Sequence, residues 1–173
     1  MNGDNRLLGK FRGVVVNNVD PLAMGRLQVQ VPSVSAIPLA SWALPCVPVA
    51  GPNYGSFAVP LPGSGVWVEF EQGDPDYPIW VGCFWGSAAE LPVLARTTPP
   101  PAPGLTFQTP LKNGVVVADA GGPMGVGGIT LQSASGATLA VNDTGIFINN
   151  AKGAQISLAG PTVDINLGAL TVV

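Results

Sequence analysis

The C-terminal part of the chain, from Ile129 to Val173, consists of very short alternating segments. Pairs of apolar residues recur along it, and one small or polar residue separates the two members of each pair. This period of two is typical of a half-buried β-strand. Turn-forming sequences such as Ser135-Gly136 and Gly160-Pro161 stand between the pairs. The pattern therefore predicts a series of short strands joined by tight turns.

Such a segment cannot form a stable domain alone. Two aliphatic residues per strand bury too little surface to offset the ordering of the backbone, which costs about 1–2 kcal/mol per residue. We therefore expect identical chains to wrap around one another as an intertwined β-helical needle, with each apolar pair pointing at a shared axis. The predicted axis residues are Leu139, Val141, Ile146, Ile148, Ile156, Leu158, Val163 and Ile165.

The composition indicates a chain that buries much of its surface against partners. Charged residues make up only 10% of the sequence and hydrophobic residues 47%, yet no run reaches the roughly 18 apolar residues of a membrane span. The net charge of −3 argues against a nucleic-acid partner, which requires a basic stripe. The N-terminus lacks the apolar core of a secretory signal, so synthesis in the cytoplasm is expected.

The distribution of charge and proline divides the chain into three regions. Residues 1–86 are expected to form a small barrel, with strands at 11–16, 25–32, 42–49, 56–60, 66–70 and 78–84. Prolines make the third of these an edge or irregular strand. Residues 87–128 are a Pro/Gly-rich linker, with a polyproline run from Thr98 to Pro103 and a lead-in strand over 111–118. Residues 129–173 are the ladder itself.

Six segments of the barrel region carry a recognisable pattern: residues 13–21, 25–32, 42–45, 50–55, 62–78 and 81–82. In their order they resemble the central spike family of contractile injection machines. This family includes the phage baseplate assembly V proteins and the valine-glycine repeat proteins of type VI secretion. Each segment is weak alone, but together they follow the family's order. The segment from Gly160 to Asn166 also resembles the trimeric β-helix of these proteins.

The resemblance implies an all-β chain, in which an OB-fold-like barrel is followed by an intertwined trimeric β-helix needle. It implies a homotrimer that acts as the structural spike or hub of a baseplate. Such a spike pierces the target envelope mechanically and meets the target membrane only during puncture. The barrels are expected to dock against hub or tube-initiating proteins, within an assembled phage tail or injection particle. The alternative is a receptor-binding or tail-fibre-like tip protein with a β-helical adhesive end.

No catalytic, cofactor or metal site is expected. The one carboxylate cluster consists of Glu69, Glu71, Asp74 and Asp76. A solvated or subunit-facing edge explains it better than a catalytic pair, because the two glutamates share a strand face and the aspartates lie in a turn. The sequence has no histidine, so the histidine-based iron site that closes some spikes of the family is not encoded. Cys46 and Cys83 are expected to be reduced and buried, although their spacing leaves a disulfide open.

The apolar end of the ladder is expected to bind another protein. Three copies of it at the end of a needle would expose hydrophobic surface and unpaired strand edges. A separate tip protein of the PAAR class is therefore predicted to cap this end; a frayed terminus without a partner is the other interpretation. The predicted docking residues are Ala169, Leu170, Thr171, Val172 and Val173.

An isolated OB-type barrel would also suggest binding to nucleic acid. Binding of that kind needs basic residues interleaved with aromatic residues on one face. Arg12 and Arg26 are the only basic residues within the expected barrel strands, and the four tryptophans have no cationic neighbours. We therefore expect the aromatic residues to serve the core and subunit contacts.

Overall fold

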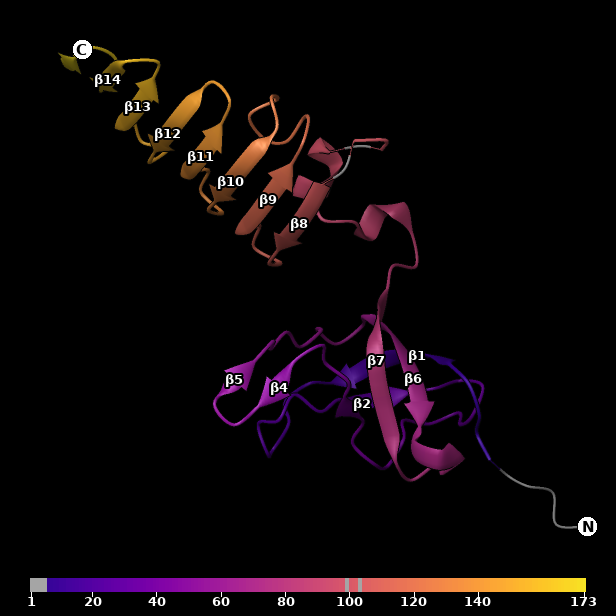
Figure 1. Ribbon diagram of the computed structural model, residues 1–173. Helices are drawn as coiled ribbons and strands as arrows, with labels where there is room; N and C mark the ends of the chain where they lie inside the picture. The colour runs from indigo at the N-terminus through magenta and orange to yellow at the C-terminus, as the bar shows by residue number, and fades with distance from the viewer. Residues whose placement is uncertain (1–5, 99, 103) are drawn as a thin grey trace, which may run out of the picture. The chain divides into compact units, whose positions relative to one another are not determined.

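The computed structural model describes residues 6–98, 100–102 and 104–173. Its described residues contain strands and short 3-10 helices, which confirms the predicted all-β class. The chain divides into two compact units, Met1–Ala88 and Ala89–Val173 (Figure 1). The 3-10 helices are η1 (Glu71–Gly73), η2 (Ala88–Glu90) and η3 (Leu94–Thr97).

The N-terminal unit is built on a five-stranded sheet with the order β2-β1-β6-β7-β3, accompanied by the hairpin β4-β5. β1 pairs antiparallel with β2 and β6, whereas β3 pairs parallel with β7. The strands are β1 (Phe11–Asn17), β2 (Gln28–Gln30), β3 (Leu44–Pro45), β4 (Ala50–Gly51), β5 (Tyr54–Gly55), β6 (Gly65–Phe70) and β7 (Pro78–Phe84).

Alternating side chains give this sheet a buried face and an outer face. In β6, Val66 and Val68 are buried, whereas Trp67 and Glu69 lie on the outer face. β-Branched residues favour such strands because they pack well on a half-buried pleated surface. The core cluster consists of Val15, Leu27, Val29, Val31, Leu39, Ala43, Val66, Val68, Phe70 and Trp80.

Three of the expected barrel strands differ from the prediction. The strand expected over 25–32 is limited to β2, Gln28–Gln30. The segment 42–49 contains only the short β3, at the edge of the sheet, as its prolines suggest. The segment 56–60 forms no strand, so that prediction is wrong. The Pro60 carbonyl oxygen accepts a hydrogen bond at 3.0 Å from the Asn18 side chain, not from the backbone N–H group of a neighbouring strand. Proline also lacks the N–H group that a ladder needs.

The C-terminal unit is one eight-stranded antiparallel sheet, in which each strand pairs with its neighbours along the chain. Figure 1 shows these strands side by side. They are β8 (Gly104–Gln108), β9 (Gly114–Ala118), β10 (Gly128–Gln132), β11 (Thr138–Asn142), β12 (Gly145–Asn149), β13 (Gln155–Ala159), β14 (Thr162–Ile165) and β15 (Leu170–Val172).

The sheet starts earlier than the predicted ladder. β8 and β9 precede Ile129 and lie within the segment that the sequence assigns to a linker. β9 occupies part of the predicted lead-in strand over 111–118. β8 has an alternating pattern of its own, but the pattern is short and directly follows the proline run. Within that run, Pro99 and Pro103 lie outside the described residues.

Two glycines allow neighbouring strands to approach closely. Gly128 opens β10 with φ +93°, and Gly145 opens β12 with φ +152°. A Cβ atom at Gly128 would collide with the carbonyl oxygen of Val141, and one at Gly145 with that of Leu158. Both positions therefore require glycine for space as well as for backbone conformation.

Candidate functional site

One face of the C-terminal sheet is apolar along its whole length. The register places Leu139 opposite Ile148, and Ile148 opposite Ile156. Because side chains alternate across a strand, these residues share one face. The same register brings together all eight predicted axis residues: Leu139, Val141, Ile146, Ile148, Ile156, Leu158, Val163 and Ile165. Their role at a trimer axis stays a prediction.

The apolar face is open in the single chain. Ile148 exposes 43% of its surface and Ile156 exposes 37%. Monomeric soluble proteins rarely present an apolar surface that continues over so many strands. This face therefore marks a site of interaction with another protein surface.

The face also includes residues that the sequence analysis left out of the axis. Phe107 of β8 lies opposite Val115 of β9, and both belong to it. Their i, i+2 spacing matches that of the ladder, and this signal could have identified them. The residues missed by the sequence analysis are Leu105, Phe107, Val115 and Val117. Ile129, Leu131, Leu170 and Val172, which belong to apolar pairs of the predicted ladder, lie on the same face.

The opposite face of the sheet carries mainly small and polar side chains. Thr130 and Ala140 lie on it and are buried, and Ser157 follows farther along. Near the start of the sheet, Leu94 of η3 packs with Val116 on this face. The chain thus covers part of this face itself and leaves the apolar face open.

The residues predicted to dock a tip protein lie in and around β15. Leu170, Thr171 and Val172 form this strand, which pairs with β14. Leu170 and Val172 are each 55% exposed, and Val173 is 93% exposed. Ala169 lies in the preceding turn. The sheet thus gathers these residues at its last strand, and their docking role stays a prediction.

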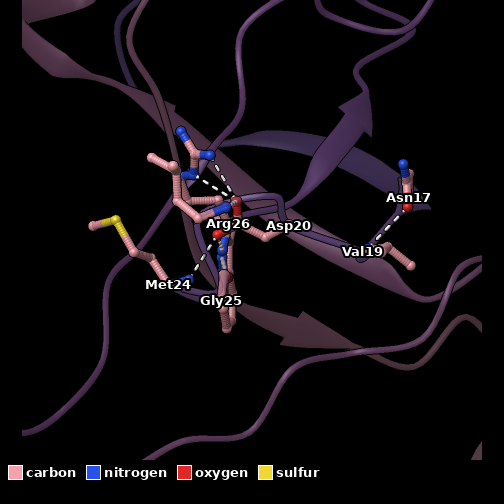
Figure 2. A network of polar contacts seen from close by, with 8 residues as sticks. Asn17, Val19, Asp20, Met24, Gly25 and Arg26 are labelled. Atoms are coloured by element: carbon pink, nitrogen blue, oxygen red, sulfur yellow. Dashed lines mark hydrogen bonds and ion pairs between the residues drawn. The ribbon is translucent and has the colours of Figure 1, made fainter.

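In the N-terminal unit, an enclosed carboxylate organises the loop between β1 and β2 (Figure 2). The Asp20 Oδ1 atom accepts hydrogen bonds from Nη2 and Nε of Arg26, at 2.6 and 3.0 Å. The backbone N–H groups of Leu22 and Met24 donate to the same carboxylate at 2.9 and 2.8 Å. These donors, with Arg26 first, hold the pKa of Asp20 well below its usual range. Asp20 therefore stays ionised and clamps the loop.

The Asp20 clamp also fixes one wall of an apolar groove. The indole N–H of Trp80 donates to the Gly25 carbonyl oxygen at 3.1 Å. Gly25 also packs against Phe57, since a Cβ atom on Gly25 would lie 3.2 Å from the Phe57 ring. The groove has a volume of about 540 Å³, and Met24, Tyr54, Phe57 and Trp80 are among its lining residues. Its shape thus depends on polar contacts beneath an apolar surface.

The expectation that the tryptophans lack cationic neighbours is wrong. The Arg12 guanidinium lies 5.3 Å from the ring centroids of both Trp67 and Phe84, and Arg26 lies 5.6 Å from the centroid of Trp42. Arg12 and Trp67 face each other across β1 and β6, a relationship that their distance in sequence hides. Two separate arginines that stack on aromatic rings, in a chain of net charge −3, still do not form the basic groove of a nucleic-acid binder.

The remaining candidate groups form no chemical site among the described residues. Glu69 pairs with Lys10 at 2.6 Å on the surface, whereas Glu71 starts η1, so the predicted shared strand face is wrong. Cys46 and Cys83 are free, but both are exposed, which corrects the prediction that they are buried. Within the described ranges, no group of His, Cys, Asp or Glu residues could hold a metal ion. No helix described there is long and apolar enough to cross a membrane.

Comparison with family models matches both units of the chain. Residues 11–85 match the Type VI secretion system/phage-baseplate injector OB domain, which confirms the predicted OB-type barrel. Residues 104–171 match the phage baseplate V C-terminal trimerisation domain, which supports the predicted homotrimer. This second match begins at the first residue of β8. Among individual curated proteins, none matches the sequence. With the two domains present in this order, the chain belongs to the phage baseplate V family of baseplate spike proteins.

Proposed function

We propose that three copies of this chain form the spike of a contractile, tail-like injection machine and pierce the target envelope when the machine contracts. In this arrangement, the apolar face of each eight-stranded sheet turns toward a common threefold axis. One observation carries the proposal: the apolar face continues from Leu105 to Val172, is open in the single chain and coincides with a trimerisation domain.

Strand length favours three copies over a larger number. Strands such as β10 and β11 have five residues, and five residues of a strand span about 17 Å. Three sheets of this width, arranged as a triangle, would each lie about 5 Å from the axis. Twice this distance equals the ~10 Å spacing of sheets that pack face to face. The two inward side chains of each strand would then meet at the axis. Four sheets would leave the centre unfilled.

Such a prism would resist compression along its axis. The strands would run across the axis, so the hydrogen bonds between them would run along it. Each strand from β9 to β14 is paired on both sides within its own chain. Eight strands with ~4.8 Å between neighbours give a stack roughly 34 Å long. A continuous hydrogen-bonded stack around an aliphatic interior is suited to a mechanical role.

The two ends of the proposed spike have different partners. Leu170 and Val172 are proposed to receive a tip protein of the PAAR class, because they are exposed and β15 pairs only with β14 among the described residues. The barrel units are proposed to contact hub or tube-initiating proteins of the baseplate. Tyr54 and Phe57 suit such contacts, because both are exposed and aromatic residues are enriched at interfaces.

The mass of the full chain in solution tests the proposal. The wild-type protein should be a trimer, and Leu158→Asp should yield monomers because it places charge on the apolar face. Ser157→Lys is the control, since it places a charge on the same strand but on the opposite face, where Asp164 lies opposite it. It should leave the trimer intact. In producing cells, only Leu158→Asp should abolish assembly of active particles. A monomeric wild-type protein would contradict the proposal.

A further inference from the structure

The turns of the C-terminal sheet alternate between the two sides at which its strands end. These two sides are called edges here, and they are distinct from the outermost strands β8 and β15. Successive strands run in opposite directions, so the turns β9-β10, β11-β12 and β13-β14 lie at one edge, called here the first edge. The turns β8-β9, β10-β11, β12-β13 and β14-β15 lie at the other, called the second edge. Figure 1 shows the turns on the two sides of the row of strands.

The charged residues of these turns are sorted by edge. Asp119 and Asp143 lie in turns of the first edge, and Lys112 and Lys152 lie in turns of the second. All four are exposed. The remaining charge of the sheet, Asp164, lies within β14. One edge is therefore acidic and the other basic.

Opposite charges on the two edges cannot meet within one chain. Asp143 and Lys152 stand at opposite ends of β12, which has five residues and therefore a length of about 17 Å. Exposed charges separated by more than a Debye length, about 8 Å at physiological salt, are largely screened from each other. A complementary partner for either edge would therefore have to come from another chain.

We infer that the acidic first edge of each copy docks against the basic second edge of the next copy, so that charge complementarity closes the trimer. This inference rests on the proposed threefold arrangement. Rotation about a threefold axis brings the first edge of one sheet beside the second edge of its neighbour, without a shift along the axis. Along the axis, the turn of Asp143 is then offset from the neighbour's turn of Lys152 by one strand spacing, about 4.8 Å. The turns of Asp119 and Lys112 are offset by the same amount in the opposite direction.

The sorted charges select the correct arrangement of copies more than they add stability. Exposed ion pairs are individually weak, but like charges brought face to face disfavour a wrong partner. Two first edges facing each other would set Asp143 against aspartate, and two second edges would set Lys152 against lysine. Edge-to-edge pairing with twofold symmetry is therefore opposed, and a closed ring with one direction is favoured.

Cysteine crosslinking tests the geometry. In full-length protein carrying Cys46→Ser and Cys83→Ser, Asp143→Cys combined with Lys152→Cys should give covalent trimers on mild oxidation. Either cysteine alone should give no covalent trimer, because the equivalent positions of the three copies lie at different corners of the triangular trimer. The matched control combines Asp119→Cys with Lys152→Cys, which lie three strand spacings, roughly 14 Å, apart along the axis and exceed disulfide reach. Equal crosslinking of both pairs, or of neither, would overturn the inference.

Charge reversal tests the electrostatics. Asp143→Lys and Lys152→Asp should each lower the melting midpoint of the trimer by several degrees in 10 mM salt, and the double variant should recover most of the loss. In 1 M salt the losses should disappear, because the Debye length falls from about 30 to about 3 Å. Asp76→Lys, an equal charge change in an exposed barrel turn, should have little effect at either salt concentration.

The two proposals fail in different ways. A trimeric wild-type protein in which the double reversal is no better than the single ones would overturn the edge pairing and leave the trimer standing. A monomeric wild-type protein would instead overturn the proposed function, on which the edge pairing depends.

Discussion

Arg26 donates two hydrogen bonds to a single oxygen of Asp20, from Nη2 at 2.6 Å and from Nε at 3.0 Å. Backbone N–H groups of the same loop complete the set of donors, and the Asp20 side chain is only 3% exposed. A short segment of loop thus wraps around one ionised carboxylate. This contact holds Gly25 in a position where its carbonyl oxygen accepts the hydrogen bond from the Trp80 indole N–H. Gly25 and Trp80 both line the apolar groove.

The low pKa of Asp20 predicts a dependence of stability on pH. A carboxyl whose pKa is depressed by folding stabilises the fold above its unfolded pKa of about 3.9, and this contribution is lost as the pH falls further. The melting midpoint of the wild-type barrel should therefore fall more steeply below pH 4 than that of Asp20→Asn. At pH 7, Asp20→Asn should melt earlier than wild type. The exposed Asp76→Asn control should follow wild type throughout, and parallel acid profiles for all three proteins would contradict the assignment.

Shortening a side chain on the apolar face should weaken the trimer. If Ile148 is buried at the axis, Ile148→Ala should cost about 2–5 kcal/mol per chain, as buried Ile-to-Ala changes do. The loss should appear as a dissociation that depends on protein concentration in analytical ultracentrifugation. Ile37→Ala is the control, since Ile37 is exposed on the barrel unit and should change stability by less than about 0.5 kcal/mol. Similar small effects at both sites would exclude Ile148 from the axis.

Gly145→Ala should destabilise the C-terminal sheet. The added Cβ atom would meet the carbonyl oxygen of Leu158, so β12 and β13 would have to move apart. We expect a loss of about 1–3 kcal/mol from strained backbone alone, and more from the collision. Gly153→Ala separates the two effects, because Gly153 also has a positive φ but has open space around it. Chemical denaturation of both variants should show the larger loss for Gly145→Ala.

Removal of residues 169–173 should separate tip binding from assembly. Light scattering should still report a trimer, because the apolar face from β8 to β14 remains. Capture of a purified PAAR-class tip protein should be lost, because the exposed Leu170 and Val172 are gone. Truncated trimers that still bind the tip protein would show that it docks elsewhere.

The ladder residues could be placed on one face from sequence because the signal is local. Ile146 and Ile148 are two residues apart, and in a strand this spacing fixes their common side whatever the partner. The same rule applies to Leu105 and Phe107, which the sequence analysis missed only because they follow a proline run. The segment 56–60 failed for the opposite reason. Its alternation is genuine, but among the described residues the segment pairs with no strand, and Pro60 lacks the N–H group that a ladder needs.

Local sequence patterns are enough to predict the all-β class, the barrel followed by short strands, and the eight apolar residues that share one face of the ladder. These features follow from period-two alternation and turn residues, which act over a few positions. Contacts between residues far apart in the sequence become visible in the folded chain alone. There Arg12 lies beside Trp67, Asp20 pairs with Arg26, and both cysteines are exposed. The turn lysines and the turn aspartates lie at opposite edges of the sheet. The register of paired strands fixes such contacts, and register is a property of the folded chain.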